Sequence, residues 1–168
     1  MVDVAKNLLA IKAQLPEGVE LTAVSKFHPD EYITAAYNVG QRIFGESHEQ
    51  ELARKAASLP KDIHWHFIGH LQTNKVKYIA PYISMIESVD SIRLLREIEK
   101  QGARCGRRIR VLLELHIAEE ATKYGLTPDD CRSLLADGEW QQMEHLEICG
   151  LMMMASHTDD HDQIAREM

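Results

Sequence analysis

Residues 111–115, VLLEL, are the stretch of this sequence that decides the fold. The run is apolar almost throughout and shows no alternation of polar and apolar positions. This pattern is typical of a strand in a parallel sheet, because helices cover both faces of such a sheet. We therefore predict a buried strand at residues 109–117 and a parallel sheet around it.

The chain on either side of this run alternates between short β-rich segments and longer helical patterns. Regular alternation of this kind predicts a parallel sheet covered by helices. We expect strands at residues 20–25, 42–45, 65–69, 84–89, 109–117 and 146–154. We expect helices at residues 3–15, 30–38, 48–58, 91–101, 129–136 and from 163 onward.

Several expected helix starts carry residues that are typical of N-caps. Thr127 precedes one helix, and Asp90 or Ser91 precedes another. Residues 47–50, SHEQ, have the spacing of a capping box, in which Ser47 would cap the helix that follows. These signals support the expected boundaries.

Two architectures fit this order of elements, an open doubly wound sheet and a (β/α) barrel. No glycine follows the first strand in SKFHPD, residues 25–30, which weakens the case for a dinucleotide-binding fold. About six strand–helix units are present, whereas a closed barrel of this type has eight. Either the sheet is open or the sequence is a fragment of a barrel.

Charge and hydropathy limit the classes of partner. The net charge is −7, and the one cluster of arginines, at residues 104–110, spans a helix end and a strand start. Without a basic face, nucleic-acid binding is not expected. Bilayer-spanning segments need about 20 apolar residues, and no run approaches that length, so no membrane segment is expected.

Cysteine usage and the N-terminus indicate the compartment. Cys105, Cys131 and Cys149 are an odd number without metal-type spacing, which indicates reduced thiols in a cytoplasmic protein. Lys6 and Lys12 interrupt the apolar stretches at the N-terminus, so a signal peptide is not expected. The chain length fits a single domain.

Lys26 is the first candidate for chemistry. It stands where the strand at residues 20–25 ends, and (β/α) barrels place their active sites at the carboxyl ends of their strands. An unprotonated lysine amine can form an imine with an aldehyde. Position alone, however, also fits an ordinary solvated lysine at the end of a strand.

The histidines offer a second hypothesis. His64 and His66 lie on the same face of one expected strand, and His70 follows it closely. Such a pair could hold zinc, with SHTDDH (residues 156–161) supplying a further ligand. No spacing fixes that third ligand, so packed or hydrogen-bonded histidines are an equally good interpretation.

Three further loops are candidates for the rim, which is the edge of the barrel at the carboxyl ends of its strands. IFGESHEQE (residues 43–51) turns from a strand into a helix N-terminus, where free N–H groups favour anions. LQTNKVK (residues 71–77) is a polar turn. Lys123 follows the longest strand and could meet an anionic group at the same rim as Lys26.

Together these segments resemble one family, the pyridoxal phosphate homeostasis proteins. AVSKFHP (23–29), IFGES (43–47), WHFIGHLQTNK (65–75) and GLMMMA (150–155) have the order and spacing of the family motifs. LLELHIAEEATKYGL (112–126) is similar to the family's fifth-strand segment. The resemblance covers essentially the whole chain, and WHFIGHLQTNK is its most specific part.

This resemblance implies the fold and the cofactor. The fold would be α/β, a (β/α) TIM-type barrel of the alanine racemase N-terminal type, which is fold type III of the pyridoxal phosphate proteins. Lys26 would carry pyridoxal 5'-phosphate as an internal aldimine. Ser47 stands where the family usually has asparagine, and the shorter side chain puts a cofactor contact there in question. His66 and Met152 match family residues near the ring, and Lys123 matches a rim lysine implicated in cofactor handling.

The resemblance also implies a function. It predicts a cytoplasmic protein, monomeric at full length, that holds the cofactor without turning over a substrate and passes it to dependent apo-enzymes. An amino-acid racemase of the same barrel type is the alternative, although no tyrosine here matches the second base of alanine racemases. A metal-dependent barrel hydrolase built on His64, His66 and His70 is the third.

One departure from the family bears on binding. The family continues through two further strands, whose turns bind the cofactor phosphate, and neither is present in this sequence. We therefore interpret residues 1–168 as one domain with six of the eight βα units of a barrel. Because the phosphate would lose its main donors, we expect weak cofactor binding.

Overall fold

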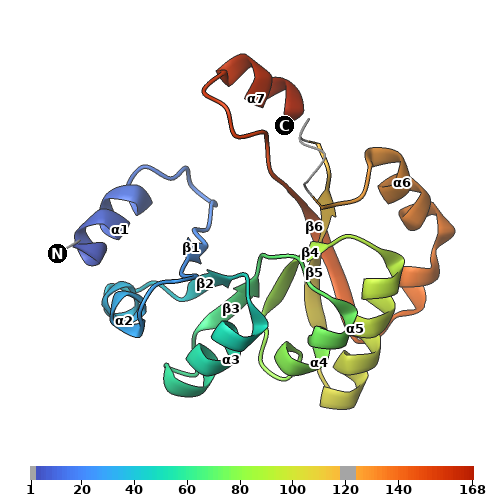
Figure 1. The fold of residues 1–168 in the computed structure, drawn as a ribbon, viewed down its shortest axis with the longest axis horizontal. Coiled ribbons are helices and arrows are strands. Elements are labelled where there is room, and N and C mark those ends of the chain that lie inside the picture. Colours follow the sequence, from blue (N-terminus) through green and yellow to red (C-terminus); the bar gives the residue numbers. More distant parts are fainter. Residues whose placement is uncertain (1–2, 118–123) are drawn as a thin grey trace.

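The computed structural model describes residues 3–117 and 124–168, which form an α/β fold on one parallel sheet (Figure 1). The described strands are β1 (Ala23–Val24), β2 (Ile43–Glu46), β3 (His64–Phe67), β4 (Met85–Val89), β5 (Ile109–Leu115) and β6 (Leu146–Met153). They lie side by side in sequence order, and each neighbouring pair is parallel. A doubly wound sheet would reverse its strand order, so this order is that of a barrel wall.

The helices that connect consecutive strands cover the outer side of the curved sheet, whereas the first helix precedes β1 and the last follows β6 (Figure 1). The described helices are α1 (Val4–Lys12), α2 (Asp30–Asn38), α3 (Glu49–Ser58), α4 (Val76–Ile79), α5 (Ile92–Cys105), α6 (Pro128–Asp137) and α7 (His161–Glu167). Two 3₁₀ turns, η1 (Thr73–Lys75) and η2 (Glu139–Gln142), complete the described elements. Each predicted strand and helix is therefore present, and α4 with the two 3₁₀ turns was not predicted.

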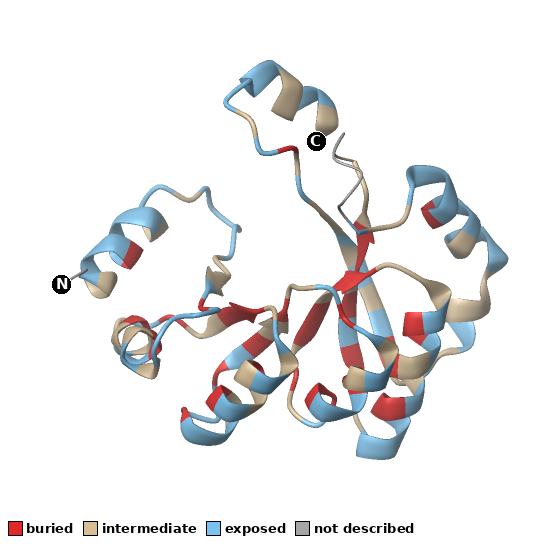
Figure 2. Ribbon diagram, in the orientation of Figure 1, coloured by how far each residue is buried: buried red, intermediate tan, exposed pale blue. Residues whose placement is uncertain are grey.

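The two faces of the sheet have different chemistry. Phe44, Phe67 and Val111 point toward the helices and are buried in the core with helix residues such as Leu95. Because side chains alternate along a strand, the neighbours of these residues point to the barrel interior. Figure 2 shows the buried positions where strands and helices meet, whereas the outer helix surfaces are exposed.

The helix starts confirm two predicted caps and correct one. Thr127 accepts a hydrogen bond from the Asp130 amide, and Ser91 accepts one from the Leu94 amide. The predicted capping box at residues 47–50 is wrong. The N-cap of α3 is His48, whose side chain makes no capping bond, and Ser47 lies one position too early to cap the helix.

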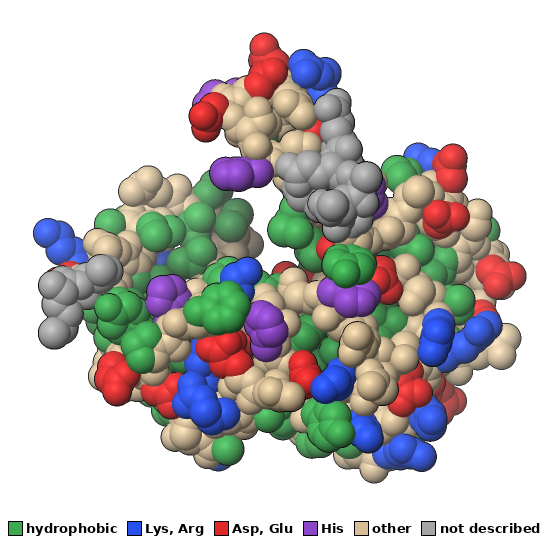
Figure 3. All heavy atoms as spheres, viewed as in Figure 1, with side chains coloured by type: hydrophobic (Ala, Val, Ile, Leu, Met, Phe, Trp, Pro, Cys, Tyr) green, Lys and Arg blue, Asp and Glu red, His purple; other side chains and the backbone are tan. Residues whose placement is uncertain are grey.

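No helix in residues 3–117 and 124–168 is long and apolar enough to cross a membrane. Figure 3 shows lysine and arginine side chains interspersed with acidic ones on the face that it presents, with no continuous basic surface there.

Candidate functional site

Lys26 stands two residues beyond the end of β1 and is exposed, as an ordinary solvated lysine at a strand end would also be. It lies in a tight turn, in which the His28 amide donates to the Ser25 carbonyl oxygen at 3.1 Å. Phe27 has a φ of +63°, and no other described non-glycine residue has a positive φ. Turns of this shape normally have glycine or asparagine at that position, so the backbone beside Lys26 is strained.

A buried ionic cluster lies beneath this turn. The Lys55 ammonium, on α3, is fully buried and donates at 2.7 Å each to the Ser25 carbonyl, Glu46 Oε1 and Glu51 Oε1. Glu46 Oε1 also accepts a 2.6 Å bond from the Ser25 hydroxyl. Glu51 Oε1 accepts a 2.9 Å bond from the Phe27 amide. The cluster therefore contacts the residues on both sides of Lys26.

The cluster sets the ionisation of Glu51. Burial alone would raise the pKa of this carboxyl, but hydrogen bonds from Lys55 and from the Phe27 amide outweigh burial and hold the pKa below its usual value. Glu51 therefore stays a carboxylate near neutral pH and keeps its charge toward Lys55. Glu46 Oε2 is buried and has no hydrogen-bond partner among the described residues.

Ser47 is half-buried at the carboxyl end of β2. Its backbone packs directly against Gly69, which follows β3. A Cβ at Gly69 would lie 2.6 Å from the Ser47 carbonyl oxygen, so only glycine fits there. This contact brings the ends of β2 and β3 together at the rim.

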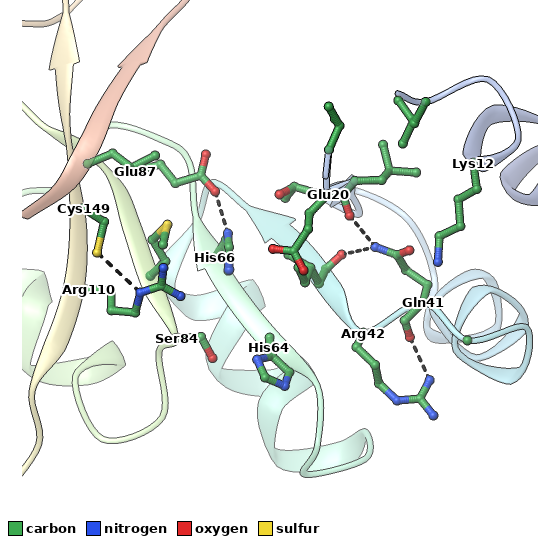
Figure 4. A pocket seen from close by; sticks show the side chains of 18 of the residues that line it. Lys12, Glu20, Gln41, Arg42, His64, His66, Ser84, Glu87, Arg110 and Cys149 are labelled. Atoms are coloured by element: carbon green, nitrogen blue, oxygen red, sulfur yellow. Dashed lines mark hydrogen bonds and ion pairs between the residues drawn. The ribbon is translucent and has the colours of Figure 1, made fainter. Parts of the chain in front are cut away.

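His66 points into the barrel interior, where its Nδ1 lies 2.6 Å from Glu87 Oε1 on β4 (Figure 4). Both residues line a cavity of about 910 Å³. Lys26 is not among the described residues that line this cavity. The structure thus places Lys26 and Ser47 at the rim and His66 in the interior.

The same cavity carries a second polar pair. Arg110 on β5 donates to Cys149 Sγ on β6 at 3.4 Å, and Figure 4 shows both beside the His66–Glu87 pair. This hydrogen bond raises the pKa of the Arg110 guanidinium. Lys12, Glu20 and Arg42 also line the cavity, so the barrel interior is polar and charged.

Met152 is half-buried near the carboxyl end of β6, opposite Glu114 on β5. Burial, together with the charge of Asp90, raises the pKa of Glu114. Lys123 lies outside the described residues. Next to that segment, the Tyr124 ring stacks on His70, with ring centroids 3.9 Å apart.

The three histidines of the metal hypothesis have different surroundings. His66 pairs with Glu87, His70 lies 3.4 Å from Asp90, and His64 is exposed. No group of three or more histidine, cysteine, aspartate or glutamate side chains that could hold a metal ion occurs within residues 3–117 and 124–168.

Sequence reasoning missed the groups that support the rim. Glu51 and Lys55 have the i, i+4 spacing of a helical ion pair, which was the available signal for the cluster. Glu87 gave no comparable signal, because its pairing with His66 depends on strand register. The arrangement presents an exposed lysine on a strained turn beyond the carboxyl end of β1 and, apart from it, a polar cavity in the barrel interior.

Sequential parallel strands with helices between them define the class, the wall of a (β/α) barrel, and comparison with known proteins gives its family. The chain belongs to the alanine racemase N-terminal domain family, whose model matches residues 2–168. The predicted fold class is therefore confirmed.

Within this family, the curated relatives include proteins named pyridoxal phosphate homeostasis protein. That of Schizosaccharomyces pombe is 38% identical over 140 residues, covering 82% of this chain and 58% of the relative. The human protein is 36% identical over 152 residues, covering 85% of this chain and 55% of the relative. The resemblance found in the sequence is thus confirmed, and the chain spans little more than half the length of these relatives.

Solved structures of other proteins have the same fold. PipY of Synechococcus elongatus PCC7942, in a structure with PLP bound, has a TM-score of 0.81 and 31% identity, covering 98% of this chain and 81% of that one. Alanine racemase from Streptomyces coelicolor A3(2) also has a TM-score of 0.81, at 20% identity over 98% of this chain and 45% of that one. The likeness to the racemase shows the fold alone.

Proposed function

We propose that this protein binds pyridoxal 5'-phosphate covalently through the Lys26 amine and acts as a non-catalytic carrier in pyridoxal phosphate homeostasis. One observation carries the proposal. An exposed lysine follows β1 of a barrel wall that matches PipY, whose structure holds PLP. The names of the curated relatives give the physiological role.

The residues at the rim fit this cofactor. Lys26 is exposed, and within the described part of the chain its ammonium makes no hydrogen bond or ion pair. Pyridoxal phosphate supplies an aldehyde, with which an unprotonated amine reacts. Lys26 would hold the aldehyde carbon.

The other candidate residues would orient the cofactor. His66, kept in place by Glu87, would lie on the interior side of the ring, and Met152 would pack near it from β6. Ser47 would offer a short polar group at the end of β2. Lys123 would also bind the cofactor.

The proposed lack of turnover rests on the tyrosines of residues 1–168, none of which matches the second base of alanine racemases. Racemisation needs bases on both faces of the substrate, and a lysine supplies only one of them. The candidate tyrosines have other surroundings. The Tyr37 hydroxyl bonds to Asp62, and burial raises the pKa of Tyr82 to about 12, which makes it a poor base near neutral pH.

We also propose that residues 1–168 form one domain with six of the eight βα units of a barrel. The greater length of the curated relatives supports this. The proposed carrier works in the cytoplasm as a monomer at full length. Its partners are apo-enzymes that need pyridoxal phosphate, and its three free cysteines suit a reducing compartment.

Borohydride trapping tests the proposal. The protein is incubated with pyridoxal 5'-phosphate and reduced, and the labelled lysines are located by peptide mass spectrometry. Lys26→Ala should lose the dominant label. Lys100→Ala, which removes another exposed lysine on α5, should keep it. Equal labelling of Lys26 and Lys100 would overturn the covalent site.

A racemase assay on the same samples tests the proposed lack of turnover. We expect no interconversion of L- and D-alanine above the Lys26→Ala background. Turnover that depends on Lys26 would make the protein an enzyme and would contradict the carrier role.

A further inference from the structure

The turn that presents Lys26 is held by side chains that lie outside the cofactor site. Ser25 and Phe27, the two neighbours of Lys26, both bond to the buried cluster on α3 and β2. The Ser25 carbonyl accepts from Lys55 Nζ at 2.7 Å, and the Phe27 amide donates to Glu51 Oε1 at 2.9 Å.

The backbone at this turn would not keep its shape unaided. Phe27 has a φ of +63°, and its side chain is 75% exposed, so core packing does not hold the residue in this conformation. A strained φ persists only where the surrounding structure over-determines it. The turn itself and β2 also hold this backbone, because the His28 amide donates to the Ser25 carbonyl oxygen and the Ser25 amide donates to the Gly45 carbonyl oxygen at 2.9 Å. At Phe27, the described contacts are the amide hydrogen bond to the cluster and a weak ring contact with His48.

We propose that Glu51 and Lys55 are positioning residues for Lys26, which clamp the strained Ser25–His28 turn so that the lysine amine projects from the rim toward the cofactor. This inference rests on the proposed role of Lys26. Neither residue would touch the cofactor, because the Lys55 ammonium is fully buried and Glu51 faces the turn backbone.

The chemistry of the cluster suits a clamp. Lys55 bridges two carboxylates and a carbonyl, which uses all three of its N–H donors. Because the group is shielded from water, these charge-assisted bonds are strong and are little screened by salt. The turn is thereby tied to α3 and β2, two elements of the folded core.

Glu51→Ala is the informative change, because Glu51 is partly exposed and its loss should leave a folded protein. Glu49→Ala is the matched control. Glu49 lies in the first turn of the same helix and pairs with Lys75 at 2.6 Å, but it makes no described contact with the Lys26 turn. Both variants therefore lose one glutamate–lysine contact.

Amide hydrogen exchange in residues 26–28 gives a readout that needs no cofactor. In Glu51→Ala, exchange of the Phe27 amide should rise by about tenfold or more, the factor expected when a hydrogen bond to a charged acceptor is lost. In Glu49→Ala it should match the wild type. Equal exchange in all three proteins would overturn the clamp.

Site-resolved labelling with pyridoxal 5'-phosphate gives the second readout. We expect Glu51→Ala to lower the labelling rate of Lys26 several-fold while that of Lys100 stays constant. If wild-type Lys26 is not labelled, the proposed function fails. The clamp is then decided by the exchange measurement alone.

Phe27→Gly separates positioning from stability. Glycine relieves the positive φ, so the unfolding midpoint should stay constant or rise, whereas Lys26 labelling should fall because the turn becomes freer. Unchanged labelling in a protein of unchanged stability would contradict the claim that the strained turn positions Lys26.

Discussion

The two faces of the sheet use charge in different ways. On the helix-facing side, the Lys55–Glu46 ion pair is sealed from water, and Lys55 supports the backbone around Lys26. On the barrel side, the His66–Glu87 pair lines an open cavity with other polar groups. Sealed charges of this kind hold a structure in place, whereas charges in a cavity remain available to a ligand or a proton.

The largest loss of stability should follow from breaking the sealed Lys55–Glu46 ion pair. Lys55→Met would leave the buried Glu46 carboxylate without its cation, and removal of one partner of a buried pair costs about 3–5 kcal/mol. Urea denaturation should show this loss of unfolding free energy. A loss below about 1 kcal/mol would mean that the pair is not sealed in solution.

The control for this variant is the double change Lys55→Met with Glu46→Gln. It removes the unpaired charge as well as its partner, so part of the lost stability should return. Equal stability of the single and double variants would contradict the coupling of these two residues.

A smaller loss of stability should distinguish the two faces of the sheet, because only side-chain packing differs between the two positions. Ile86→Val on β4 removes one buried methyl group from the helix-facing core and should cost about 1 kcal/mol. His64→Ala, at an exposed position of β3, should change stability by less than about 0.5 kcal/mol. Chemical denaturation of both variants measures the contrast. Equal losses would argue against the assigned faces.

The barrel side should also show a pH dependence. Burial raises the pKa of Glu114, so the unfolded state ionises first as the pH rises. Glu114 therefore lowers stability as the pH rises from about 4.5, its ordinary value, through the raised pKa of the folded state. Glu114→Gln should be more stable than the wild type at pH 7, and this advantage should vanish near pH 4. Denaturation curves at several pH values test this, and a constant difference would contradict it.

Apolar pattern made the fold predictable from the sequence. Each predicted strand overlaps an observed one, because apolar runs such as residues 111–115 mark the strands of the sheet. In that run Val111 and Leu113 are buried against the helices, whereas Leu112 lines the cavity, so helices cover one face of the sheet rather than both. The first strand is shorter than predicted, Ala23–Val24 rather than 20–25, and its position at the edge of the sheet leaves it one pairing neighbour. The helix α4 is four residues long, too short to show a helical period.

The site was less predictable than the fold. Lys26 could be singled out as a candidate because strand ends and the family motif mark it. The burial of Lys55 could not be found, because an i, i+4 glutamate–lysine pair has the same sequence pattern on a surface and in a core. The partner of His66 was missed because cross-strand contacts depend on register. Ser47 was misjudged as a helix cap, since its contact with Gly69 is a tertiary one.

A crystal structure of this protein grown with pyridoxal 5'-phosphate tests the central claim most directly. The account predicts continuous density between the Lys26 amine and the cofactor, with the Ser25–His28 turn still bound to Lys55 and Glu51. Density that joins the cofactor to another lysine, or a cofactor bound away from the carboxyl end of β1, would contradict it.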